Sequence, residues 1–191
     1  MCQAMIFKAK NKLIQYCPTP KCGCTSTKVM INKGIEGVDD IDYDIHHRFN
    51  TKTFEVIDAD IKFCIVRDPV SRFISSYANR ICRHNDIKFV ELDEFINNFH
   101  DKYYRLDESI YHHFRPQVDF IGNKPSYYDR IFFLHEMSSV CEFLIELIGE
   151  PIKLEKLQTV DAEKPIPTES QIDFIKSFYE DDYKFLEKIN N

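Results

Sequence analysis

Residues 18–28, Pro18-Thr19-Pro20-Lys21-Cys22-Gly23-Cys24-Thr25-Ser26-Thr27-Lys28, decide the fold class of this chain. Residues 12–17 before them are apolar enough for a buried strand, and residues 27–33 have the pattern of a helix that ends at Gly34. A strand, a tight loop and a helix start form an anion site, because the first N–H groups of a helix have no internal partner and lie at the positive end of its dipole. We therefore expect this loop to bind a phosphate-sized anion.

Several side chains of the loop favour anion binding. Gly23 allows close approach of the backbone, and Lys21 adds one mobile positive charge. Hydroxyl donors come from Thr25, Ser26 and Thr27. The pattern is not the nucleoside-triphosphate loop G-x-x-x-x-G-K-[ST], because the loop has a single glycine and its lysine comes before that glycine. Taken alone, the loop also fits a lysine-bearing turn on a soluble domain.

A second stretch, residues 67–77, supports the anion-binding interpretation. Residues 61–66 have the composition of a strand, and Asp68 and Pro69 suit the N-cap and first position of a following helix. Arg67 then lies at the carboxyl end of the strand, and Ser75 lies about two turns into the helix. Open α/β sheets bind ligands at the carboxyl ends of their strands, so we expect a second anion site beside the first.

Both stretches together resemble the sulfotransferases, in particular the branch that includes the carbohydrate sulfotransferases. The family's P-K-x-G-(C/S/T)-(T/S) pattern is matched by Pro20-Lys21-Cys22-Gly23-Cys24-Thr25-Ser26. Every fixed position of its R-D-P-x-x-R-x-x-S-x-Y pattern is matched from Arg67 to Tyr77. Looser likeness extends through Phe114-Arg115-Pro116-Gln117 and the acidic, aromatic C-terminal helix.

The resemblance implies a donor and the residues that bind it. The donor is 3′-phosphoadenosine 5′-phosphosulfate (PAPS), and 3′,5′-adenosine bisphosphate is the product, with no metal required. The 3′-phosphate is held by Arg67 and Ser75. The 5′-phosphosulfate is held by the loop residues Lys21, Cys22, Gly23, Cys24, Thr25, Ser26 and Thr27.

Sulfuryl transfer to a hydroxyl needs stabilisation of the leaving phosphate and a general base for the acceptor proton. Lys21 and the helix N-terminus suit the first task. For the base we favour His46 and His47, with His46 ahead, because some relatives with carbohydrate acceptors place their catalytic histidine between the two motifs. The resemblance also makes a carbohydrate the expected acceptor.

Two other groups of residues remain candidates for the acceptor side. His112 and His113 are the second choice for the base, and otherwise we expect them to line the acceptor pocket with Arg115. His135 and Glu136 follow the carboxyl end of a predicted strand, a position that favours function. The alternative for Glu136 is that it only caps the following helix.

Alternation of strands and helices predicts an α/β fold, with a mostly parallel central sheet and helices on both faces. The resemblance implies the same P-loop-type sandwich, and the length favours a single catalytic domain over residues 1–191. Capping-box patterns occur at residues 139–142 and 168–171. The remaining predicted elements are a strand at 130–134 and helices at 69–83, 92–99, 140–148 and 169–189, with loop and short helix at 100–129.

Composition limits the partners and the compartment. Net charge is −6, yet residues 1–34 hold six lysines and no acid, while the rest holds 19 basic and 31 acidic residues. This acidic remainder argues against nucleic-acid binding, which needs a basic footprint. Seven cysteines, no secretory segment and no apolar run of about 20 residues predict a reduced, cytoplasmic protein without a membrane span.

The cysteines of the loop do not predict a metal site. The C-x₄-C-x-C spacing of Cys17, Cys22 and Cys24 lacks the second Cys or His pair that zinc sites use, so we expect no metal. Two alternatives to a sulfotransferase stay open. One is a P-loop kinase-like phosphotransferase, and the other is a non-catalytic nucleotide-binding module on the same fold.

Overall fold

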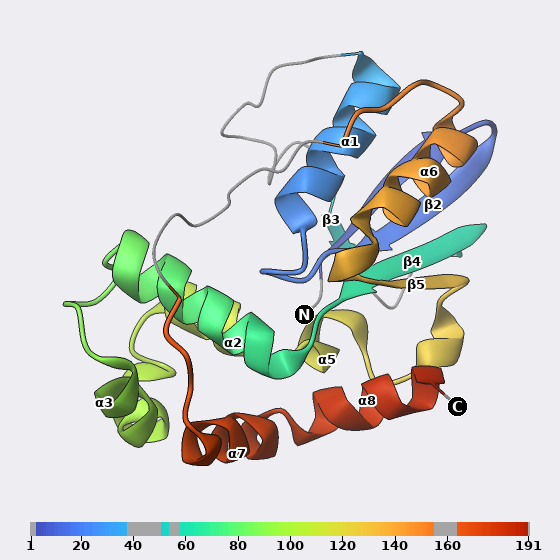
Figure 1. Ribbon diagram of the computed structural model, residues 1–191. Coiled ribbons are helices and arrows are strands. Elements are labelled where there is room, and N and C mark those ends of the chain that lie inside the picture. Colours follow the sequence, from blue (N-terminus) through green and yellow to red (C-terminus); the bar gives the residue numbers. More distant parts are fainter. Residues whose placement is uncertain (1–2, 38–50, 54–57, 155–163, 191) are drawn as a thin grey trace. The chain divides into compact units, whose positions relative to one another are not determined.

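The computed structural model describes residues 3–37, 51–53, 58–154 and 164–190 (Figure 1). Two compact units make up the chain. Unit 1 consists of Met1–Val66 and Asp119–Gln158, and unit 2 consists of Arg67–Val118 and Thr159–Asn191. A single domain over the whole chain stays a prediction.

Unit 1 contains a five-stranded sheet with the order β3-β1-β2-β4-β5. Strands β2, β4 and β5, which follow one another in this order, are parallel. Strand β1 runs antiparallel to both of its neighbours, β2 and β3. The α/β fold and its parallel strands are thus as predicted. The strands are β1 Gln3–Ala9, β2 Lys12–Cys17, β3 Thr51–Thr53, β4 Ile61–Val66 and β5 Arg130–Phe133.

The register of the parallel strands brings their carboxyl ends to one edge of the sheet. Cys17 pairs with Cys64, and Val66 pairs with Phe133. The residues that follow these strands are the predicted anion loop after β2, Arg67 after β4 and Leu134 after β5. This is the edge at which α/β sheets bind ligands.

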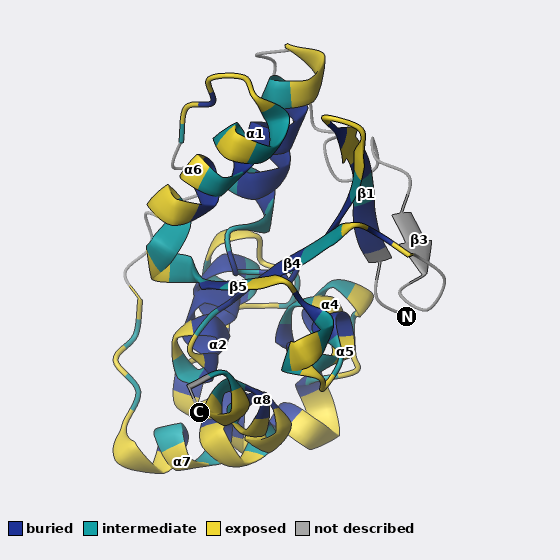
Figure 2. Ribbon diagram, turned by 90° about the vertical axis from the view of Figure 1, so that its right-hand side faces the viewer, coloured by how far each residue is buried: buried dark blue, intermediate teal, exposed yellow. Residues whose placement is uncertain are grey.

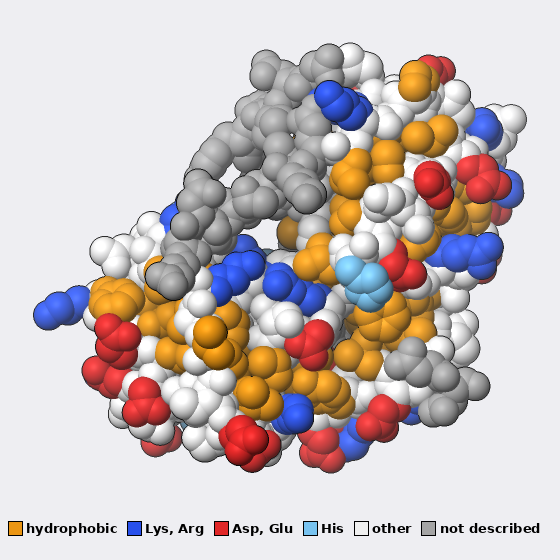
Figure 3. Space-filling view, in the orientation of Figure 1, with side chains coloured by type: hydrophobic (Ala, Val, Ile, Leu, Met, Phe, Trp, Pro, Cys, Tyr) orange, Lys and Arg blue, Asp and Glu red, His pale blue; other side chains and the backbone are white. Residues whose placement is uncertain are grey.

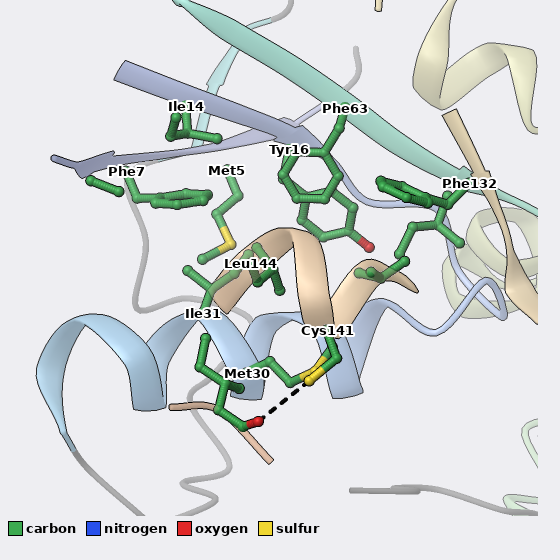
Figure 4. Close-up of a cluster of buried hydrophobic side chains, with 14 of the residues drawn as sticks. Met5, Phe7, Ile14, Tyr16, Met30, Ile31, Phe63, Phe132, Cys141 and Leu144 are labelled. Carbon is green, nitrogen blue, oxygen red and sulfur yellow. Dashed lines mark hydrogen bonds between the residues drawn. The ribbon is translucent and has the colours of Figure 1, made fainter. Parts of the chain in front are cut away.

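Helices α1 (Cys24–Glu36) and α6 (Met137–Ile148) pack together on one face of the sheet. Met30 and Leu144 from these helices join the core that contains the stacked rings of Tyr16 and Phe63, whose centroids lie 4.8 Å apart (Figure 4). On the other face, buried Gln15 accepts a hydrogen bond of 2.9 Å from the Tyr127 hydroxyl of the short helix η5 (Pro125–Tyr127).

The β1–β2 hairpin was not predicted from the sequence. Its two-residue turn, Lys10-Asn11, has φ values of 46° and 66°, so both residues adopt the left-handed conformation of a type I′ turn. Asn tolerates this conformation, but the sequence lacks the Asn-Gly or Asp-Gly pair that normally marks such a turn.

Two helix boundaries in unit 1 differ from the prediction. Helix α1 runs through Gly34 and ends before Gly37, which has φ 65°. Gly34 allows close packing instead, since a Cβ there would lie 2.8 Å from the Ile152 Cδ1 atom. Helix α6 begins at Met137 rather than Val140, directly after the short helix η6 (Leu134–Glu136), and its N-cap residue is Glu136 rather than Ser139 of the predicted box. Its end before Gly149, with φ 88°, is as predicted.

Unit 2 is helical and is built around an aromatic core. The ring of Phe73 lies 5.0 to 6.4 Å from those of Phe95, Phe99, Phe114 and Tyr179, and most of α2 is buried (Figure 2). Acidic side chains are exposed along α7 and α8 (Figure 3). The α-helices of unit 2 are α2 Pro69–Tyr77, α3 Leu92–Asn97, α4 Glu108–Phe114, α7 Glu169–Phe178 and α8 Glu180–Asn190. Its π-helices are η3 Ala78–Arg83 and η4 Phe99–Tyr103. The boundary between the two units lies within the short helix α5 Val118–Ile121.

In unit 2, the helix caps agree with those predicted from the sequence, whereas the helix lengths differ from the prediction. Asp68 accepts the Ser71 N–H at 2.7 Å, and the capping box of Thr168 with Gln171 is present. The predicted helix over 69–83 is α2 followed by the π-helix η3, and the predicted last helix is divided into α7 and α8 at Tyr179. The buried Tyr179 hydroxyl donates to the Phe114 carbonyl at 2.6 Å, which fixes the chain at this division.

Candidate functional site

The loop between β2 and α1 contains two left-handed residues. The N–H of Cys22 donates to the Thr19 carbonyl at 3.2 Å, which closes a turn with Pro20 second and Lys21 third. Lys21 has φ 65° and Gly23 has φ 75°. A positive φ at the third position is the requirement of a type II turn, normally met by glycine, so a lysine there stores about 1 kcal/mol or more of backbone strain. Such strain is concentrated at functional sites, which makes Lys21 a candidate functional residue.

The start of α1 suits a negatively charged ligand. Its first turn contains no acidic residue, and its N-cap, Gly23, has no side chain to occupy the first N–H groups. The Gly23 carbonyl accepts both the N–H and the hydroxyl of Thr27, each at 3.0 Å. The predicted ligand residues differ in exposure: Lys21, Gly23, Cys24 and Ser26 are half-buried, whereas Cys22, Thr25 and Thr27 are buried.

A second amine lies close to the loop and was not singled out from the sequence. Lys28 is one helical turn after Cys24, and it is buried. Burial lowers the pKa of the Lys28 amine, although the Cys24 thiol acts in the opposite direction. The Cys24 thiol that acts on this amine belongs to the first residue of α1, directly after the loop. A lysine among the buried residues of a helix is unusual, and this feature of the sequence could have singled out Lys28.

The segment after β5 packs against the loop within unit 1. A Cβ on Gly23 would lie 3.0 Å from the Met137 Sδ atom and 3.1 Å from the Leu134 Cδ1 atom. His135, between these two residues, is exposed and stacks on the Phe133 ring with a centroid distance of 5.6 Å. Glu136 accepts the Phe133 N–H at 2.7 Å and so caps the short helix η6 (Leu134–Glu136), which directly follows β5.

The second predicted anion motif lies in unit 2. Arg67 is half-buried and directly precedes the N-cap Asp68, and Ser75 is buried on α2. The second arginine of the motif, Arg72, is fully buried. Its guanidinium donates to the His113 carbonyl at 3.2 Å and lies 5.8 Å from the centroid of the Tyr179 ring. Arg72 therefore ties α2 to the chain near His113, and Arg67 is the arginine with access to solvent.

The predicted acceptor residues lie at the end of α4 in unit 2. His112 is exposed, and His113 and Arg115 are half-buried. The His113 Nδ1 atom lies 2.7 Å from the Ser109 carbonyl, which can only accept, so Nδ1 carries the proton and Nε2 carries the lone pair of the neutral ring. His46 and His47 lie outside the described residues.

The part of the chain that the structure describes contains no group of three His, Cys, Asp or Glu side chains that could hold a metal ion. Within the same residues, no helix is both long enough and apolar enough to cross a membrane.

The structure thus places a strained lysine turn before a helix N-terminus, at the edge of an α/β sheet where the strands end, an arrangement that is typical of anion-binding α/β proteins. The family model of the sulfotransferase family matches residues 4–188, so the chain belongs to this family. Comparison with curated proteins and with solved structures finds no match. The family makes the chain a transferase of sulfuryl groups, with a nucleotide donor and a hydroxyl acceptor.

Proposed function

We propose that the chain transfers the sulfuryl group of PAPS to a hydroxyl of a carbohydrate. The observation that carries this proposal is the Lys21 turn, in which a strained lysine precedes a helix N-terminus without acidic side chains. The loop residues 21–27 bind the 5′-phosphosulfate, and Arg67 and Ser75 bind the 3′-phosphate. The carbohydrate acceptor rests on the likeness to the carbohydrate sulfotransferases.

In the reaction, the acceptor oxygen forms a bond to sulfur while the bond from sulfur to the 5′-phosphate oxygen breaks. The acceptor proton passes to a histidine, and 3′,5′-adenosine bisphosphate leaves. Negative charge develops on the phosphate oxygen, where the Lys21 amine and the N–H groups at the start of α1 stabilise it. Donors that are already oriented by the loop need no rearrangement as this charge develops.

For the general base we propose His46, or failing that His47. His112 and His113 are the second candidates, and the 2.7 Å contact of the His113 Nδ1 atom with the Ser109 carbonyl orients the His113 ring. Loss of a general base typically lowers turnover by a factor on the order of 10² to 10⁴ without loss of donor binding. We expect this result for His46→Ala or His47→Ala, and weaker acceptor binding for His112→Ala and His113→Ala.

The donor is tested by thermal unfolding with nucleotides. We expect 3′,5′-adenosine bisphosphate to raise the melting temperature, since a ligand that binds the folded state stabilises it by mass action, and AMP to do so much less. Equal shifts with both nucleotides would refute the 3′-phosphate role of Arg67 and Ser75. The acceptor is identified by offering radiolabelled PAPS with glycans, lipids, phenols and tyrosine peptides in parallel.

A further inference from the structure

The backbone of Arg67 is held by the side chain of a residue far along the chain. The Arg67 N–H donates to the Gln117 Oε1 atom at 2.9 Å, and the Gln117 Nε2 atom donates to the Arg67 carbonyl at 2.9 Å. The primary amide of Gln117 therefore pairs with both backbone groups of Arg67, and it fixes the backbone from which the Arg67 side chain projects.

Gln117 is itself fixed by a buried carboxylate. Asp182 of α8 accepts the N–H of Gln117 at its Oδ2 atom and the N–H of Val118 at its Oδ1 atom, each at 2.9 Å. The Gln117 Nε2 atom also lies 3.4 Å from Asp182 Oδ2. Gln117 is 2% exposed and Asp182 is 1% exposed, so water does not compete for these hydrogen bonds.

The chain just before Gln117 is fixed by α2. The Ser76 hydroxyl and the Arg72 guanidinium both donate to the His113 carbonyl, at 2.9 and 3.2 Å. Residues 113–118 are therefore attached to α2 at one end and to α8 at the other. The amide of Gln117 consequently has a defined position, as it must if it is to orient another residue.

We propose that Gln117 is a positioning residue that holds Arg67 in the orientation needed to bind the 3′-phosphate of a nucleotide. This inference rests on the proposed function, in which Arg67 binds that phosphate. Charge-assisted hydrogen bonds to phosphate depend on direction, so an arginine whose backbone can shift loses affinity for it. A merely structural Gln117 would instead contribute to stability alone.

The test compares two nucleotides that differ only in the 3′-phosphate. Gln117→Met keeps the length of the side chain and removes both of its hydrogen-bonding groups. Dissociation constants for 3′,5′-adenosine bisphosphate and AMP are measured by calorimetry for the full chain and the variant. We expect the preference for the bisphosphate to fall about tenfold in the variant, the factor that corresponds to one charge-assisted hydrogen bond, while AMP binding changes less than about twofold.

A matched control removes one buried hydrogen bond elsewhere. Tyr128→Phe deletes the 2.7 Å bond from the Tyr128 hydroxyl to the Ile121 carbonyl and should leave the preference unchanged. In an Arg67→Met background, Gln117→Met should have no further effect on the preference, because the residue through which it acts is gone. An equal further loss in that background would overturn the proposal.

The outcomes separate this inference from the proposed function. If the wild type prefers the bisphosphate and Gln117→Met keeps that preference, only the positioning role is overturned. If the wild type does not distinguish the two nucleotides, the 3′-phosphate role of Arg67 fails and the inference fails with it. Should Gln117→Met not fold, Asp182→Asn decides, since it removes one acceptor from the carboxylate. We expect its preference to fall about threefold, and an unchanged preference would refute the proposal.

Discussion

Replacement of either glycine that flanks α1 by alanine tests how the anion loop is built. Gly23 and Gly37 have nearly the same backbone conformation, with φ 75° and 65° and ψ 15° at both. Their surroundings differ: a Cβ on Gly23 would lie 3.0 Å from Met137 Sδ and 3.1 Å from Leu134 Cδ1, whereas nothing lies within 4 Å of a Cβ on Gly37. The two substitutions thus share a backbone cost and differ in packing.

The magnitudes follow from these contacts. A left-handed conformation costs alanine about 1–2 kcal/mol relative to glycine, so Gly37→Ala should lower the free energy of unfolding by that amount. Gly23→Ala has the same cost and adds the displacement of two side chains, for which overpacking typically costs about 1–3 kcal/mol. The contacting atoms are near the ends of flexible side chains, so we expect an additional loss of about 1 kcal/mol.

Urea unfolding followed by far-ultraviolet circular dichroism measures both variants against the wild type. The expected difference between them corresponds to about 2–4 °C in melting temperature for a chain of this length. Gly23→Ala should also lose sulfuryl transfer, whereas Gly37→Ala should retain it. Equal destabilisation by the two substitutions, or a smaller one at Gly23, would refute the close packing of the loop against the start of α6.

Three further predictions concern single side chains. Lys21→Ala should lower turnover about a hundredfold and should lower the affinity for 3′,5′-adenosine bisphosphate much less, because the lysine stabilises charge that develops in the transition state. Weaker binding of the bisphosphate with unchanged turnover would show that Lys21 only anchors the phosphate. Glu136→Ala should lower the free energy of unfolding by about 1 kcal/mol through loss of the cap on Phe133, and a collapse of turnover at unchanged stability would instead give Glu136 a catalytic role. Burial raises the pKa of the Asp182 carboxyl above its ordinary 3.8, so the folded state binds this proton more tightly and the contribution of Asp182 to stability falls as pH rises through the window that starts at 3.8. Urea unfolding across that window should show the stability of the wild type relative to Asp182→Asn decreasing with pH, and an increase would contradict the buried carboxylate.

The elements that carry the anion motifs were predictable because their signals are local. An apolar run gives β2 and β4, and Asp68 followed by Pro69 marks the start of α2 with its own side-chain cap. The left-handed turn at Lys10-Asn11 gave no such signal, because neither residue is the glycine that this conformation favours. Gly34 predicts a helix end because a glycine inside a helix is unfavourable, yet here its lack of a side chain allows the Ile152 side chain to pack closely against α1.

The surroundings of Arg67 could not be predicted from the sequence. Asp182 stands among three consecutive acids, Glu180-Asp181-Asp182, and local pattern does not show which of them turns inward. Its partners Gln117 and Val118 lie more than 60 residues away in the chain, so only the packed unit reveals the pairing. The likeness at residues 114–117 pointed to this segment as a motif, but it did not indicate that Gln117 contacts Arg67.

Transfer of label from radiolabelled PAPS in the presence of EDTA tests the central claim most directly. The chain is offered the panel of acceptors, and product formation is compared with release of 3′,5′-adenosine bisphosphate. We predict a sulfated glycan, formed in equal amount with the bisphosphate, without added metal, and lost in Lys21→Ala. Transfer of phosphate from ATP that requires Mg²⁺, with all label remaining on PAPS, would contradict the assignment and favour a phosphotransferase.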